Sequence, residues 1–180
     1  PLYPHYAGPT WATANDQFFR SLTELRHQPA VRVTPEYFNR PSWIDALAGS
    51  VERAYADLDH TPDVLVASYH GMPVRYYEEG DPYFEQCHET SRLLARRLGW
   101  DPERIHTTFQ SVFGREEWLK PYTIEHIAAL GADGKSVAVI SPAFSADCVE
   151  TLEEIDVLIR GAHRDAGGSR FTYIDCLNDD

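Results

Sequence analysis

The apolar positions of this chain follow two different spacings. Short apolar runs, bounded by polar or turn-forming residues, occur at 63–70, 104–111, 136–144 and 170–177, and apolar residues alternate with polar ones at 31–38. Runs of this length and kind are typical of β-strands. The pattern therefore predicts five strands spread along the whole chain.

Between these runs, apolar residues recur every three or four positions, which is the period of a helix that packs one face onto a core. The helical segments expected from this spacing are 11–27, 41–58, 81–99, 120–131 and 147–162. Strands that alternate with helices form parallel sheets with helices on both faces. The sequence therefore predicts an α/β fold with a Rossmann-like parallel sheet.

Three loops leave the carboxyl ends of expected strands, after His70, Ser111 and Phe144. Ligands of open parallel sheets bind outside these ends, so we expect the three loops to converge on one site. His70 stands at the tip of an apolar run, directly before a turn at 71–73. A histidine there can ligate a metal or accept a proton near neutral pH. The alternative is a partly exposed strand end without a function.

Acidic residues are spaced along the expected helix that follows Phe144. Asp147, Glu150 and Glu154 stand three and four positions apart, so they share one stripe of a helix. One interpretation is structural: Asp147 caps the helix, Glu150 completes an acidic capping box, and Glu154 lies on a solvated face. The other is functional, a row of carboxylates that passes protons or hydrated metal ions between a histidine and solvent.

Composition narrows the class of protein. The chain has 180 residues, 43% hydrophobic and 24% charged, which is typical of one soluble globular domain. A net charge of −12 argues against nucleic acid as the main partner. The cysteines, Cys87, Cys148 and Cys176, are odd in number and widely separated, which favours a reducing cytoplasm over a disulfide framework.

Three long motifs add a family resemblance. In this order and spacing, SYHGMPVRYYEEGDPY (68–83), TTFQSVFGREEWLKPYT (107–123) and SPAFSADCVETLEEID (141–156) closely resemble ferrochelatase, the enzyme family that inserts Fe(II) into a porphyrin to make haem. The resemblance runs the whole length of the chain and covers about the second half of a typical member. It implies a fold of two Rossmann-like lobes with the porphyrin between them.

The resemblance also implies a division of the chain. We expect 1–10 to be the end of a strand and a linker from a missing first lobe. We expect 11–180 to be the second chelatase lobe, with its C-terminal helix truncated. A cleft between two lobes needs both walls, so the 180-residue chain is expected to lack turnover by itself.

Individual residues match the family's motifs. His70 matches the essential histidine of S-x-H-G-x-P, and Glu150 the essential glutamate of E-T-L-x-E. Glu154 matches the next acid one turn along, and Asp147 the aspartate just before that helix. The resemblance implies that these four residues are catalytic and that His70 and Glu150 also bind the metal.

The chain departs from the family in three places. The first is GPTW (8–11), where only Thr10 matches the family's small polar run. Val112 stands where many relatives carry Arg or Lys, and Leu158 stands where the carboxylate row would continue. Some relatives hold an iron–sulfur cluster on four cysteines. Three scattered cysteines cannot form that site, so we expect no cluster, and no cofactor beyond the substrate Fe(II).

The resemblance further implies porphyrin and ferrous iron as substrates, the missing N-terminal lobe as a partner, and no nucleic acid. It places the protein in the cytoplasm, with peripheral association at the inner membrane surface. Two alternatives from other classes are a non-catalytic tetrapyrrole- or metal-binding module and a cobalt chelatase for another tetrapyrrole.

Overall fold

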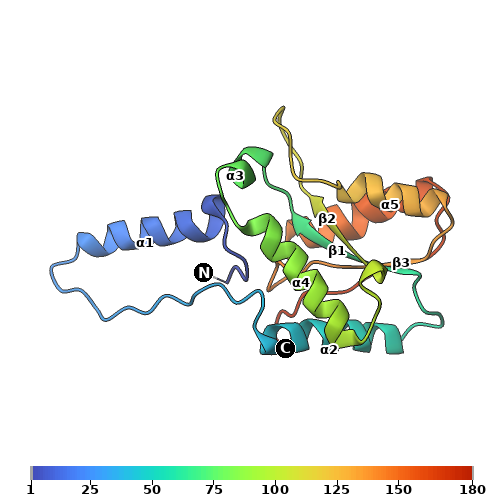
Figure 1. The fold of residues 1–180 in the computed structure, drawn as a ribbon, viewed down its shortest axis with the longest axis horizontal. Helices are drawn as coiled ribbons and strands as arrows, with labels where there is room; N and C mark the ends of the chain where they lie inside the picture. Colours follow the sequence, from blue (N-terminus) through green and yellow to red (C-terminus); the bar gives the residue numbers. More distant parts are fainter. Residues whose placement is uncertain (1, 180) are drawn as a thin grey trace.

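A parallel sheet forms the centre of the protein (Figure 1). In the computed structural model, which describes residues 2–179, its strands are β1 (Val64–His70), β2 (Ile105–Gln110), β3 (Val137–Ile140) and β4 (Phe171–Tyr173). Their order is β2-β1-β3-β4, and the three pairings are all parallel. The predicted α/β class with a parallel sheet is confirmed.

Helices follow the strands as the spacing predicted. Two helical segments are π-helical, η1 and η3, and η2 is a single 3₁₀ turn. The helical segments are η1 (Gly8–Ala12), α1 (Thr13–Thr23), α2 (Pro41–Ala56), α3 (Val74–Glu78), α4 (Tyr83–Leu98), η2 (Pro102–Arg104), α5 (Thr123–Ala132), η3 (Glu150–Ile159) and α6 (Arg160–Asp165).

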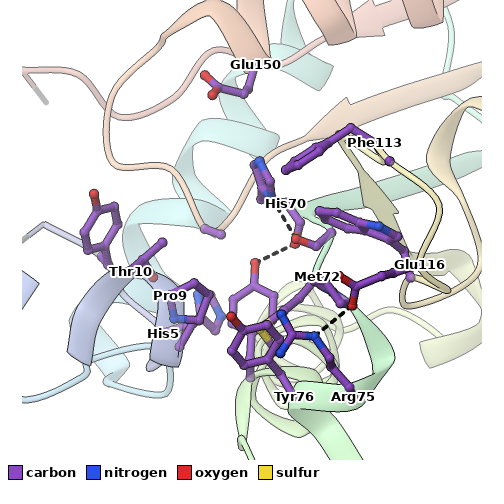
Figure 2. Close-up of a pocket in the computed structure, with 18 of the residues that line it drawn as sticks. His5, Pro9, Thr10, His70, Met72, Arg75, Tyr76, Phe113, Glu116 and Glu150 are labelled. Atoms are coloured by element: carbon purple, nitrogen blue, oxygen red, sulfur yellow. Dashed lines mark hydrogen bonds and ion pairs between the residues drawn. The ribbon is translucent and has the colours of Figure 1, made fainter. Parts of the chain in front are cut away.

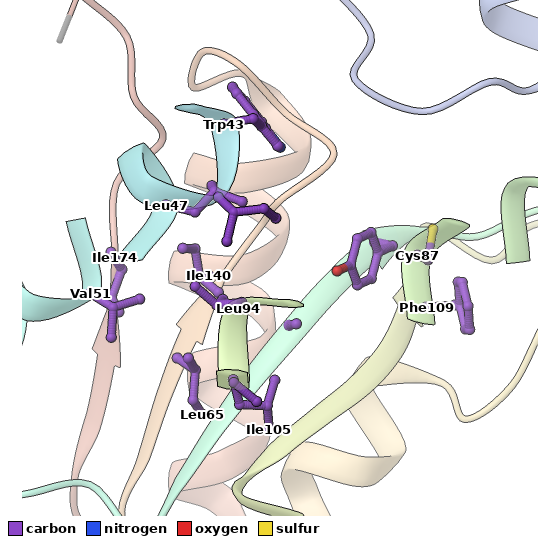
Figure 3. Packing of buried hydrophobic residues seen from close by; sticks show 14 of the residues in the cluster. Trp43, Leu47, Val51, Leu65, Cys87, Leu94, Ile105, Phe109, Ile140 and Ile174 are labelled. Atoms are coloured by element: carbon purple, nitrogen blue, oxygen red, sulfur yellow. The ribbon is translucent and has the colours of Figure 1, made fainter. Parts of the chain in front are cut away.

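Strand β1 divides the interior into two cores. Leu65 and Tyr69 belong to the core under α2 and α4, part of which is drawn in Figure 3. Val64 and Val66 belong to the core under α5 and η3. Successive side chains of a strand point to opposite faces, so one apolar run supplies both layers. Burying each such side chain stabilises the fold by about 1.5–3 kcal/mol.

The first residues of the chain are packed into the body. His5 is buried, and its Nε2 lies 2.9 Å from Oγ1 of Thr90 on α4. The carbonyl of Pro4 accepts a hydrogen bond from the amide of Tyr37 at 2.8 Å. Burial lowers the pKa of His5 to about 3. The division into a linker at 1–10 and a lobe at 11–180 stays a prediction, and its end residues, Pro1 and Asp180, lie outside the described residues.

The prediction of a strand at 31–38 is wrong, because this segment has no regular secondary structure. A strand forms only where a neighbour pairs with it, and no strand of the described sheet lies beside 31–38. The other four strands are confirmed. β3 and β4 are shorter than their apolar runs at 136–144 and 170–177, because pairing ends before the apolar residues do.

Helix α1 is confirmed within 11–27, but it lies away from the sheet (Figure 1). Its apolar residues Phe18 and Phe19 are 44% and 46% exposed. Together α1 and the irregular segment 24–36 form an arm that extends from the body. Helices α2, α4, α5 and η3 pack on the sheet and account for the other predicted helical segments.

Candidate active site

The site lies where the chain changes direction across the sheet. After β1 the chain runs to β2 on one side, and it later returns to β3 on the other side of β1. An opening forms at the carboxyl ends of strands at such a switch point. Here it is a cavity of ≈ 560 Å³, within the usual range for small-molecule sites.

The three loops expected to converge on one site do so. The cavity is lined by His70 and the turn at 71–73, by 113–116 after β2, and by Ala143 and Phe144 after β3. Glu150, the first residue of η3, also lines it, and the first ten residues contribute a further wall (Figure 2). The convergence predicted from the strand ends is therefore confirmed.

His70 is held in one orientation at the tip of β1. Its Nδ1 lies 2.8 Å from the carbonyl oxygen of Gly71, so this nitrogen carries the hydrogen and donates it. The backbone carbonyl of His70 accepts a hydrogen bond from the Tyr83 hydroxyl at 3.0 Å. The lone pair of the neutral ring is then on Nε2. That nitrogen can accept a proton or bind a metal.

Gly71 is needed by the close approach of two loops. Its amide donates to the carbonyl of Gln110 at 2.7 Å. A Cβ added at Gly71 would lie 2.6 Å from that same oxygen and 3.0 Å from the Trp118 ring. Only glycine allows such contacts, which explains a glycine directly after the site histidine.

Glu150 begins a π-helix of ten residues, where the sequence predicted an ordinary helix. Its backbone carbonyl accepts a hydrogen bond from Nε2 of Gln110 at 2.7 Å. No side-chain cap is made at the start of η3, so the capping interpretation of Asp147 and Glu150 is not supported. The wide turns of π-helices are frequent at functional sites. Figure 2 shows the Glu150 side chain above the same cavity as His70.

Glu154 is tied to the end of β2. Its carboxylate accepts hydrogen bonds from the amide and hydroxyl of Ser111, at 2.6 and 2.5 Å, and from Nε2 of Gln110 at 3.2 Å. Ser111 has a φ of 61°, a conformation that residues other than glycine seldom adopt. The bonds to Glu154 help to hold it there. Glu154 is not among the residues that line the cavity.

Asp147 is held in a separate hydrogen-bond cluster. It accepts from the Tyr173 hydroxyl at 2.5 Å, from Nδ2 of Asn178 at 2.8 Å and from Oγ1 of Thr151 at 2.9 Å. Burial opposes its ionisation, but these bonds outweigh burial, and the pKa of Asp147 is lowered. Asp147 does not line the cavity. Of the four predicted catalytic residues, the structure therefore places His70 and Glu150 on the cavity, and Glu154 and Asp147 outside its lining.

Apolar and basic side chains form the rest of the wall. Phe113, Met72 and Trp118 supply apolar surface, and Arg75 and Arg115 supply positive charge. Nε of Arg75 is 2.7 Å from Oε2 of Glu116, as Figure 2 shows. Sequence reasoning did not single out these arginines or Gln110. Their only signal was their place in the motifs at 68–83 and 107–123.

Comparison with known proteins identifies the family. The family model described as "Ferrochelatase" matches residues 1–180. The chain belongs to the ferrochelatase family. It is 68% identical over 181 residues to a ferrochelatase of Rhodobacter capsulatus, which covers 100% of this chain and 52% of that relative. It is 56% identical to one of Chelativorans sp. over 99% of this chain and 51% of the relative. This ferrochelatase-family chain thus spans about half the length of these curated relatives.

A solved structure shares the fold. "SirB from Bacillus subtilis with Fe3+" superposes with a TM-score of 0.61 over 99% of this chain and 63% of that one, at 13% sequence identity. At this identity, the likeness supports the shared α/β architecture of the ferrochelatase-family chain and nothing finer.

Proposed function

We propose that this chain carries the reactive side of a cleft in which Fe(II) is inserted into a porphyrin to form haem. The observation that carries the proposal is the placement of His70 and Glu150 on one cavity, in a chain of the ferrochelatase family. Neither His70 nor Glu150 alone would indicate metal insertion. An imidazole with a free Nε2 and a carboxylate across the same space form an acid–base and metal-binding pair.

Metallation of a porphyrin releases two pyrrole N–H protons and removes water from Fe(II). We assign His70 as a proton acceptor or metal ligand and Glu150 as its partner. A positioned base of this kind typically contributes about 10²–10⁴-fold in rate. Imidazole and carboxylate are both plausible ligands of Fe(II).

The metal is cargo here, and the small number of protein ligands fits that role. Within residues 2–179, no group of three or more His, Cys, Asp or Glu side chains is arranged to hold a metal ion. A closed site of four protein ligands keeps its metal, whereas a site with open positions exchanges ligands. Two groups on a cavity wall leave positions for the ring nitrogens that must take the metal over.

We assign Glu154 and Asp147 to a relay that leads protons away from the cavity. Support comes from Glu154, which lies on η3 one turn beyond Glu150. Nε2 of Gln110 donates hydrogen bonds both to the backbone carbonyl of Glu150 and to the carboxylate of Glu154. Asp147 is the less well placed of the two, because three side chains already bind its carboxylate.

The walls of the cavity suit a flat, apolar ring with acidic substituents. Phe113 and Trp118 offer apolar faces, and Arg115 adds positive charge to the wall, beside an Arg75 that is already paired with Glu116. The residues that would close the opposite side belong to the half that the relatives have in addition. We therefore propose that the 180-residue chain has negligible turnover without that first lobe.

We also propose a cytoplasmic location with peripheral contact at the inner membrane surface. No helix in residues 2–179 is long and apolar enough to cross a bilayer. Support for a peripheral contact comes from Phe113, which lines the cavity, and from Val149 and Leu152, which flank Glu150 in the sequence. Their side chains are 68%, 67% and 52% exposed. Cys87 is buried in the core, which supports the expectation that the cysteines hold no iron–sulfur cluster.

Zinc or iron insertion into a dicarboxylic porphyrin, followed by absorbance, tests the proposal on the full-length protein. We expect saturable turnover that falls by at least about 10²-fold in His70→Ala. His27→Ala, a change of an exposed histidine on the arm, is the matched control and should leave turnover unchanged. Turnover with cobalt and sirohydrochlorin but not with porphyrin would instead establish the cobalt chelatase alternative.

A further inference from the structure

Two histidines meet on the sheet, away from the cavity. His106 is the second residue of β2, and His126 lies in the second turn of α5. Nδ1 of His106 is 2.7 Å from Nε2 of His126, and the ring planes cross at 67°. Twenty positions of sequence separate the two residues, and the packing of α5 on β2 brings them together. Both side chains are half-buried, so one side of the pair faces solvent.

Both rings are kept in the form that binds metals. Burial is the main cause that lowers the pKa of His106 and of His126, and a charge on His106 would lower that of His126 further. Metal ions bind the neutral imidazole through its lone pair. In the contact as it stands, one hydrogen lies between the two nitrogens, and a metal would replace that hydrogen.

The distance between the nitrogens nearly fits a shared metal. Metal–nitrogen bonds of about 2.0–2.1 Å in a tetrahedral site place two ligand nitrogens about 3.3 Å apart. The pair therefore has to open by about 0.6 Å from its hydrogen-bonded distance of 2.7 Å. Both side chains must also rotate, so that the two lone pairs point to the same metal ion. β2 is an edge strand of the described sheet and both side chains are half-buried, which leaves a side open to water for the remaining coordination positions.

We propose that His106 and His126 form a second divalent-metal site on the seam between β2 and α5, separate from the cavity. His106 pairs with Val66, four positions before His70, which puts the site about 13 Å from the tip of β1. Two imidazoles and water favour Cu²⁺, Ni²⁺ and Zn²⁺ over Fe²⁺. The described residues offer no third His, Cys, Asp or Glu ligand, so the site is open and exchangeable.

The test uses the full-length protein with His70→Ala and Glu150→Gln, which removes the metal-binding pair of the cavity. Cu²⁺ is titrated by calorimetry, and the bound ion is examined by electron paramagnetic resonance for nitrogen couplings. We expect one Cu²⁺ with two imidazole nitrogens. Adding His126→Gln should weaken binding by more than the about tenfold that loss of an outer partner costs. Adding His27→Gln should change nothing.

His106→Gln is a second, independent variant, and it should give the same loss and leave at most one nitrogen coupling. Glutamine keeps a hydrogen-bonding group at each position, so circular dichroism of the metal-free variants should match the parent. Unchanged Cu²⁺ affinity in either variant, or a spectrum without two imidazole nitrogens in the parent, would overturn the proposal. Every protein in this comparison carries His70→Ala and Glu150→Gln, so the outcome is independent of the proposed chelatase activity.

Discussion

The side chain of Gln110 donates a hydrogen bond to the backbone carbonyl of Glu150, at 2.7 Å, and so joins the end of β2 to the start of η3. The same amide nitrogen lies 3.2 Å from the carboxylate of Glu154. On its other side, Oε1 of Gln110 accepts from the hydroxyl of Ser68, which in turn meets the hydroxyl of Thr123. These buried hydrogen bonds thus hold the backbone of Glu150 in position at the cavity.

Replacing this link should loosen η3. Gln110→Met keeps the size of the side chain but removes the hydrogen bond to the carbonyl of Glu150 and leaves the hydroxyl of Ser68 with Thr123 alone. We expect a loss of about 1–3 kcal/mol in the free energy of unfolding, together with a fall in kcat that exceeds any change in KM, because Glu150 is no longer positioned. Urea unfolding and porphyrin metallation kinetics on the full-length protein measure both effects.

Gln28→Met is the control for that variant. Gln28 also donates to a backbone carbonyl, that of Leu22 at 3.1 Å, but it is exposed on the arm. Its loss should change stability by less than about 0.5 kcal/mol. Equal effects of the two changes would show that Gln110 is not a positioning residue.

Glu150→Gln separates a chemical role from a structural one. The Gln110 bond goes to the backbone of Glu150, so the substitution leaves it intact. We expect most of the turnover to be lost at a nearly unchanged melting temperature, because an amide neither takes a proton nor binds a metal well. Glu153→Gln, on an exposed position of the same helix, should keep full activity. An active Glu150→Gln enzyme would remove Glu150 from the mechanism.

Gly71→Ala should disturb the site histidine through its neighbour. The new methyl group would lie 2.6 Å from the carbonyl of Gln110, so the turn has to shift and carry His70 with it. Overpacking of this kind costs about 1–3 kcal/mol. We expect a lower melting temperature and reduced turnover.

Gly161→Ala is the matched change for that prediction, because a Cβ at this helical glycine meets nothing within 4 Å. Alanine is the better helix former by about 0.5–1 kcal/mol, so this variant should be as stable as the parent or more so. Thermal unfolding of both variants by calorimetry decides the matter. A Gly71→Ala protein that melts with the parent would contradict the close approach.

The stability of the protein should decline below neutral pH because of His5. Its pKa is lowered to about 3 in the folded chain and is about 6.5 in the unfolded chain. The unfolded state therefore takes up the proton first. The contribution of neutral His5 is fully present above pH 6.5 and is lost as the pH falls toward 3. By pH 4.5 the loss reaches about 2–3 kcal/mol.

A comparison with His5→Gln isolates this term. Glutamine can still donate to Thr90 but does not titrate. Urea unfolding between pH 7.5 and 4.5 should show a shallower decline for the variant, even if the variant is less stable at every pH. Parallel declines in the two proteins would show that His5 is not the group responsible.

Much of the sheet and half of the candidate site could be predicted from the sequence. The apolar run 63–70 had the length of a buried strand, and the rule for strand ends then placed His70 at the cavity. The segment 31–38 was predicted wrongly because alternation describes a strand's side chains but not its neighbour. Pairing is a tertiary property, and within residues 2–179 no strand pairs with this segment.

The details of η3 could not be predicted for a related reason. Apolar spacing indicates a buried helical face, but over ten residues it does not distinguish an α-helix from a π-helix. The bond from Gln110 to Glu150 spans 40 positions. The bond from Tyr173 to Asp147 spans 26 positions and ties up a carboxylate that the helical spacing grouped with Glu150 and Glu154. Neither contact has a local signal in the sequence.

The position of His70 at the tip of β1 has a consequence for the thermal inactivation of the protein. β1 pairs with strands on both sides, and its side chains anchor both helical layers. Its amides should therefore exchange with deuterium only when the whole molecule opens. The imidazole is thus attached to the element that we expect to open most slowly. If the proposed activity depends on His70, its thermal loss in the full-length protein should coincide with global unfolding and should not precede it.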